Sequence, residues 1–227
     1  MIDPPRPGED LVLADPERAL AVAYAPPDRR AGLTALFALD ERFGRVIAST
    51  TEPMIGLMRL TWWREALEKL DRDPAPAEPL LHALADHALP HGLTGKALAD
   101  IEDGWAALID GEVDDTAIAR HGRERGGKMF AAASVLLGAT DSRLLAAGEV
   151  WALADLGFRH SQASVRDAAR ARALSIAGEI PADRWSVAAR PLAALYLLAR
   201  RDAQNGKRKQ GSPGRLLRVL ALRLFGR

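Results

Sequence analysis

Two charged side chains, Asp40 and Arg59, lie where predicted helices should be apolar. In residues 33–48, a step of about 100° per residue places Asp40 on the face that carries the leucines and phenylalanines. Arg59 falls in the middle of the apolar side of residues 54–70. An unpaired charge in apolar surroundings is costly, so each side chain needs a partner. We therefore predict that Asp40 and Arg59 meet.

Such a pair has two possible roles. It would either be a buried ion pair that only fixes the register of two helices, or form the polar floor of a ligand pocket. Arg59 would also be placed to stack on Trp62 or Trp63, one turn further along. Gly44, in mid-helix, costs about 1 kcal/mol relative to Ala, which indicates close approach by a neighbouring element.

The elements that position these residues are predicted to be helices. Alanine and leucine dominate the 227 residues, and alternating stretches of β-branched residues are nearly absent. Proline and glycine divide the chain into roughly eight helical segments. Asp15 and Pro16 have the types of an N-cap and a first helical residue, and Pro191 predicts a kink or break. The fold class is therefore all-α.

Several other kinds of site are disfavoured by the sequence. The absence of cysteine removes disulfides and thiolate chemistry. The stretch "GRERGGKM", 122–129, follows the glycine spacing of a phosphate-binding loop, but it lacks the final Ser or Thr and a preceding strand. Its glycines, Gly126 and Gly127, are instead predicted to form a turn. The five histidines lack the spacing of a zinc site, and no nucleic-acid-reading motif is visible.

Residues 15–67, and above all "RLTWWREAL" at 59–67, resemble the squalene/phytoene synthase family. The resemblance continues more weakly to about residue 198. It implies an isoprenoid (terpenoid) synthase-like helical bundle with a central cavity. It also implies two aspartate-rich motifs on facing helices, whose carboxylates hold the Mg²⁺ ions that neutralise a diphosphate leaving group.

Most of those acids are missing here. The first motif matches Gly44, Arg45 and Ala48, and the core of the second retains only Asp155, with Arg159 one turn later. Arginines would hold phosphate directly, but that is binding without metal-assisted ionisation. We therefore expect no catalytic residue, no metal site and no cofactor. The alternative is an active prenyl-diphosphate-using transferase with an atypical site, which would use Mg²⁺.

One branch of the family, the phytoene-synthase-like assembly factors of respiratory complex I and their bacterial relatives, has a closer pattern. It resembles this chain in a small residue followed by Arg-Val in place of the aspartates, and in the tryptophan-arginine helix. The resemblance implies a scaffold or assembly role, with a protein partner or an isoprenoid lipid. The candidate ligand or cavity residues are Asp40, Gly44, Arg45, Arg59, Trp62, Trp63, Arg64, Asp155 and Arg159.

The basic end of the chain contrasts with an acidic body. From Arg200 onward there are nine Lys or Arg and one Asp, and the rest of the chain carries a net charge of −7. We predict a helical domain at 1–206, a flexible basic linker at 207–214 and an amphipathic helix at 215–227. Arg215, Arg218 and Arg223 of that helix would contact an anionic membrane or a partner, while its leucines face the other way or pack on the body.

The start of the sequence lacks the basic and apolar stretches of a signal peptide, and no apolar run approaches the roughly 20 residues that span a bilayer. The expected location is cytoplasmic, peripheral to the inner membrane.

Overall fold

The computed structural model describes residues 11–208 and 210–226, and within them every regular element is a helix. The all-α fold class is thereby confirmed. The predicted domain at 1–206 and helix at 215–227 include residues 1–10 and 227, which lie outside the described residues. The α-helices are α1 (Pro16–Tyr24), α2 (Arg30–Ala48), α3 (Pro53–Lys69), α4 (Pro79–His87), α5 (Gly95–Ala99), α6 (Glu102–Ala106), α7 (Asp115–Arg120), α8 (Lys128–Leu137), α9 (Leu144–Arg159), α10 (Ala163–Glu179), α11 (Arg190–Asn205) and α12 (Pro213–Phe225). Two short 3₁₀ turns, η1 (Pro27–Arg29) and η2 (Leu89–His91), and one π-helical segment, η3 (His121–Gly127), complete the bundle.

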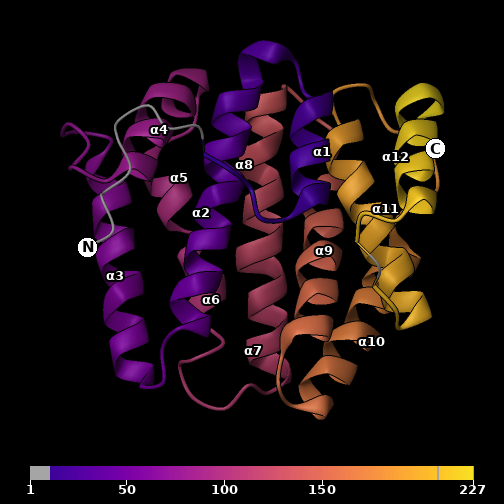
Figure 1. Ribbon diagram of the computed structural model, residues 1–227. Helices are drawn as coiled ribbons and strands as arrows, with labels where there is room; N and C mark the ends of the chain where they lie inside the picture. The colour runs from indigo at the N-terminus through magenta and orange to yellow at the C-terminus, as the bar shows by residue number, and fades with distance from the viewer. Residues whose placement is uncertain (1–10, 209, 227) are drawn as a thin grey trace.

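The long helix α9 is the centre of the bundle and is buried along most of its length. It packs against α8, η3, α10 and α11, while α2 contacts α4 and α8. Figure 1 shows α3 at one edge of the bundle and α12 at the other, with α2, α8 and α9 between them. The core is filled mainly by leucine, alanine and aromatic side chains of these helices.

Local sequence signals explain several helix boundaries. The Asp15 carboxylate accepts hydrogen bonds from the backbone N–H groups of Glu17 and Arg18, so Asp15 is the predicted N-cap of α1. Pro53 lies in the first turn of α3, as expected. Pro191 lies in the first turn of α11, so the predicted break falls at the start of this helix. A proline is tolerated there because the backbone N–H groups of the first turn have no acceptor within the helix.

The glycines of the "GRERGGKM" stretch do not form the predicted turn. Residues His121–Gly127 are π-helical and continue directly into α8. A Cβ on Gly126 would lie 2.1 Å from the Gly148 carbonyl oxygen of α9. Gly126 is therefore needed because two helix backbones touch there, and the prediction of a turn was wrong.

The segment between α11, which ends at Asn205, and α12, which begins at Pro213, overlaps the predicted linker at 207–214, whose last two residues belong to α12 and whose residue 209 lies outside the described residues. Among the helices of the described residues, none combines the length and apolar character needed to cross a bilayer.

Candidate functional site

Arg125 is the centre of a buried network of charges and is only 1% exposed. It belongs to η3, which brings its guanidinium between α2 and α9. Its Nε and Nη2 donate to the two oxygens of Asp40, at 2.8 and 2.9 Å. The same Nη2 donates to Asp155 Oδ2 at 3.1 Å. One arginine thus binds both carboxylates that α2 and α9 direct inward.

Asp40 has two further partners besides Arg125. Arg18 of α1 places its Nη2 at 2.9 Å from Asp40 Oδ2, and the indole Nε1 of Trp105 donates to Oδ1 at 2.9 Å. Burial would raise the pKa of Asp40, but the positive charges of Arg125 and Arg18 outweigh that effect and lower it below the ordinary value. Asp40 is therefore a fully buried, ionised carboxylate.

Asp155 is held in the same way from a different side. Its Oδ1 accepts hydrogen bonds from Arg159 Nε and from Arg208 Nη1, each at 2.7 Å. Burial would raise its pKa, yet the charge of Arg125, followed by those of Arg159 and Arg208, lowers it well below the usual range. Burial alone would lower the pKa of Arg125, but Asp40 and Asp155 raise it above its ordinary value.

His121 completes the surroundings of Arg125. Its Nδ1 lies 2.7 Å from the Gly104 carbonyl oxygen, and its Nε2 lies 3.2 Å from Arg125 Nη1. Burial and the neighbouring charge of Arg125 lower the pKa of His121 to about 3. A neutral ring that donates from Nδ1 and accepts at Nε2 makes both contacts hydrogen bonds.

Aromatic rings enclose the Arg125 guanidinium. Its central carbon lies 4.1 Å from the ring centre of Trp105 and 4.8 Å from that of Trp151. Such cation–π contacts strengthen when water is excluded. Gly44 allows this packing, because a Cβ there would lie 3.1 Å from the Trp105 ring. The close neighbour that Gly44 predicted is therefore confirmed.

A cavity of about 890 Å³ lies beside this network. Of the candidate residues, Asp40, Gly44, Arg45, Asp155 and Arg159 line it. So do several residues that the sequence did not single out, namely Arg18, Trp105, His121 and Arg125. The volume is within the usual range of small-molecule sites.

The family can now be stated from comparison with known proteins. A family model described as "Squalene/phytoene synthase" matches residues 11–155, more than half of the chain. The chain belongs to the squalene/phytoene synthase family. That confirms the resemblance carried by the tryptophan-arginine helix and the helix before it. No solved structure matches the chain.

Two curated relatives have informative names. The human and rat proteins called "NADH dehydrogenase (ubiquinone) complex I, assembly factor 6" are 32% and 33% identical to this chain over 96 residues. The matched part is 42% of this chain and 29% of each relative, so it spans less than a third of their length. This similarity over 96 residues confirms the predicted resemblance to the complex I assembly factor branch of the squalene/phytoene synthase family.

Magnesium, which the squalene/phytoene synthase family implies, does not fit these residues. Gly44 and Ala48 offer no side-chain oxygen, and Arg45 repels a cation. Asp40 and Asp155 already accept hydrogen bonds from arginines on both oxygens. Among residues 11–208 and 210–226, no three His, Asp or Glu side chains form a group able to hold a metal ion.

The predicted pairing of Asp40 with Arg59 was wrong. Arg59 is exposed, and its Nη1 lies 3.4 Å from Thr50 Oγ1. Leu60, Trp63 and Leu67 of α3 are buried, but the first part of the helix is largely uncovered, with Met54, Ile55 and Met58 exposed, and Arg59 lies in that part. Asp40 is satisfied instead by arginines from α1 and η3.

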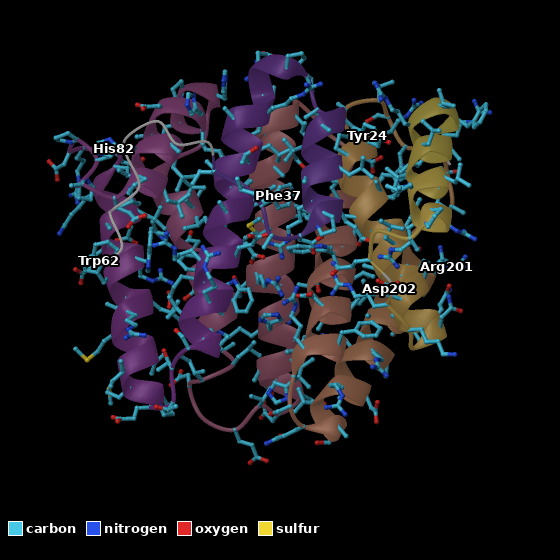
Figure 2. The ribbon with its side chains drawn as sticks, in the orientation of Figure 1. Tyr24, Phe37, Trp62, His82, Arg201 and Asp202 are labelled. Atoms are coloured by element: carbon cyan, nitrogen blue, oxygen red, sulfur yellow. The ribbon has the colours of Figure 1, made fainter. Side chains whose placement is uncertain are left out.

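The other α3 candidates also lie outside the cavity. Trp62 is 49% exposed and is labelled at the outer edge of the bundle in Figure 2, whereas Trp63 is buried against Phe43. Arg64 donates to Glu102 at 2.8 Å and also bonds Asp103, so it joins α3 to α6. The most family-specific stretch of α3 therefore supports packing and does not line the cavity.

Arg125, the central residue that sequence analysis missed, has one weak sequence signal. Gly122 and Gly126 surround it, and Gly104 meets its backbone, where a Cβ would lie 2.2 Å from the Arg125 nitrogen. Glycines on both sides of a short charged stretch allow tight helix packing around a buried charge. Such a pattern is indistinguishable in sequence from a polar loop.

Proposed function

We propose that this protein is a catalytically degenerate member of the squalene/phytoene synthase family that acts as a scaffold or assembly factor. The observation that carries the proposal is the bidentate contact of Arg125 with Asp40, together with its bond to Asp155. Metal-dependent ionisation of a diphosphate needs carboxylates that are free to bind cations. Here the inward carboxylates neutralise arginines, which supports a role without metal-dependent ionisation at this site.

The proposed partner is respiratory complex I or one of its assembly intermediates. The names of the human and rat relatives, which are 32% and 33% identical to this chain over 96 residues, support this. The proposed location is the cytoplasm, peripheral to the inner membrane, where the basic end of the chain would contact anionic lipid.

The cavity would hold an isoprenoid or related lipid in this proposal. Its volume of about 890 Å³ is in the range of small-molecule sites, and the aromatic ring of Trp105 in its wall suits an apolar chain. The bound lipid would signal to the partner that lipid is available, and it would not be converted to a product.

Two measurements test the proposal together. Purified protein is incubated with farnesyl or geranylgeranyl diphosphate and Mg²⁺, and diphosphate release is expected to stay at background. Tagged protein expressed in cells that contain complex I is expected to co-purify complex I subunits, identified by mass spectrometry.

The alternative, an active prenyl transferase, predicts diphosphate release. Any release is compared with that of Asp40→Asn/Asp155→Asn protein, checked for folding by circular dichroism. Release that disappears in this variant would overturn the non-catalytic proposal, whereas unchanged release comes from a contaminant. Absence of complex I subunits from the captured material would overturn the assembly role.

A further inference from the structure

The outer face of α12 is apolar and unpacked. Leu216, Leu217, Leu220, Leu224 and Phe225 are between 42% and 65% exposed. The leucines fall on one side of the helix at about 100° per residue. This helix is at the edge of the bundle and contacts mainly α11 (Figure 1). Its apolar face therefore points away from the protein.

The orientation of α12 is fixed by a buried arginine. Arg215 Nη2 lies 2.8 Å from Glu17 Oε2 of α1 and 3.0 Å from Asp202 Oδ2 of α11. Val219 and Leu222 are buried on the same side of the helix. If the helix rotated about its axis to bury its leucines, Arg215 would be separated from Glu17 and Asp202. Leaving buried charges without partners is costly. The expectation that Arg215 contacts a membrane or partner was therefore wrong, and the leucines take the outer position.

A groove between α11 and α12 adjoins the leucine face. It has a volume of about 390 Å³. Its apolar floor includes Leu198, Val219 and Leu222, and its other lining residues include Arg200, Arg201 and Arg218. Figure 2 labels Arg201 on the outer side of α11. The groove thus combines guanidinium groups, which bind phosphate well, with a short apolar surface.

From residue 200 onward, the exposed charges of the described residues have a single sign. Asp202 is the only acid from residue 200 to the end of the sequence, and it is buried against Arg215. Arg201, Lys207, Arg218 and Arg223 are all exposed. On the helix, Arg218 and Arg223 flank the leucines on opposite sides. An apolar face flanked by positive charge on both sides is typical of helices that lie in the interface of an anionic bilayer.

We propose that α12 and the adjoining groove bind the surface of an anionic phospholipid bilayer. The leucine face enters the region between headgroups and acyl chains, and Arg200, Arg201 and Arg218 bind a lipid phosphate at the groove. This proposal rests on the peripheral location suggested above and is independent of the assembly role. A protein partner fits less well, because the leucine face offers no exposed acid to complement a mixed-charge surface.

The test uses the full-length protein and flotation with lipid vesicles. Binding is expected to phosphatidylcholine vesicles that contain phosphatidylglycerol and not to phosphatidylcholine alone, and it should weaken as salt is raised. Inorganic phosphate at the same concentration as lipid phosphate should not compete, because it lacks the apolar chain.

Variants separate the two parts of the surface. Leu217→Glu/Leu224→Glu should abolish vesicle binding, while Leu145→Glu, at a leucine of α9 that is 53% exposed, should leave it unchanged. Arg200→Gln/Arg201→Gln/Arg218→Gln should reduce affinity for anionic vesicles by about 100-fold. Arg200 is half-buried and the other substituted side chains are exposed, and circular dichroism verifies folding of each variant.

Equal binding to neutral and anionic vesicles, or unchanged binding by the leucine variant, would overturn the proposal. Loss of complex I co-purification in the leucine variant without vesicle binding by the native protein would assign the face to a protein partner instead. Because the vesicle assay contains no other protein, its result does not depend on the proposed assembly function.

Discussion

Arg125 and Asp40 come from positions 85 residues apart and form a two-point contact in which Nε and Nη2 bind both carboxylate oxygens, at 2.8 and 2.9 Å. A planar guanidinium fits a carboxylate in this way, and a lysine would not reproduce it. The contact joins α2 to η3, and the bond from Arg125 to Asp155 adds α9. The charges in the middle of the bundle therefore act as a structural connection between three helices.

Asp40→Ala is expected to lower the free energy of unfolding by about 3–5 kcal/mol, because it leaves Arg125 and Arg18 buried with an uncompensated charge. Denaturant unfolding of the single and double variants measures the effect. In double-mutant cycles, Asp40 should couple strongly to Arg125 and not to Arg59, whose effects should add to those of Asp40 within about 0.5 kcal/mol. Coupling of Asp40 to Arg59 would contradict the structure.

Gly126→Ala is expected to destabilise the protein by about 1–3 kcal/mol or more, since its Cβ would lie 2.1 Å from the Gly148 carbonyl oxygen. Gly178→Ala is the matched control. That glycine is helical and exposed, with no atom within 4 Å of an added Cβ, so the change should stabilise by about 0.5–1 kcal/mol. Thermal unfolding of both variants checks the pair, and equal effects would contradict close packing of η3 on α9.

Stability is expected to fall as the solution is acidified below pH 6.5. The pKa of His121 is lowered from 6.5 to about 3, so between these values the unfolded chain binds a proton that the folded protein does not. The slope from this group reaches at most about 1.4 kcal/mol per pH unit. The lowered pKa values of Asp40 and Asp155 add a further loss at pH values below their ordinary range.

His121→Gln isolates the histidine contribution. The variant should lose the pH dependence between about 4 and 6.5 while it retains the steeper loss at lower pH. Urea unfolding at a series of pH values measures this, and an unchanged profile would show that His121 titrates normally in the folded protein.

Magnesium is expected to leave the melting temperature unchanged. A ligand that binds only the folded state raises stability in proportion to the logarithm of its concentration above Kd. Because Asp40 and Asp155 are held by arginines, there is no free carboxylate pair for the ion between α2 and α9. Calorimetric scans across a magnesium series, with calcium as a second ion, provide the measurement. A rise in melting temperature specific to magnesium would favour the transferase alternative.

Much of the fold could be predicted because the signals are local. The inward face of α2 follows from helical periodicity, and the starts of α1, α3 and α11 follow from Asp15 and the prolines. Asp40 was correctly expected to be buried and paired, since it interrupts an apolar face. These inferences use residues that are neighbours within one helix.

The partner of Asp40 could not be predicted in this way. Arg125 lies in a stretch of polar residues and glycines whose periodicity is that of a π-helix, so the usual 100° step does not identify its inward face. On α3, Arg59 and Trp63 lie one turn apart on the same side of the helix, but Trp63 packs against Phe43 while Arg59 lies in the exposed first half of the helix. Both outcomes depend on contacts between helices.

Because the network around Arg125 is closed, metal-dependent chemistry at this place would require several simultaneous substitutions. An acid introduced at Gly44 would meet the Trp105 ring, and loss of Arg125 would leave Asp40 and Asp155 facing each other with less positive charge between them. Each single step costs stability before any metal could bind. Substitutions at the surface should therefore be tolerated more readily than substitutions in the charged centre.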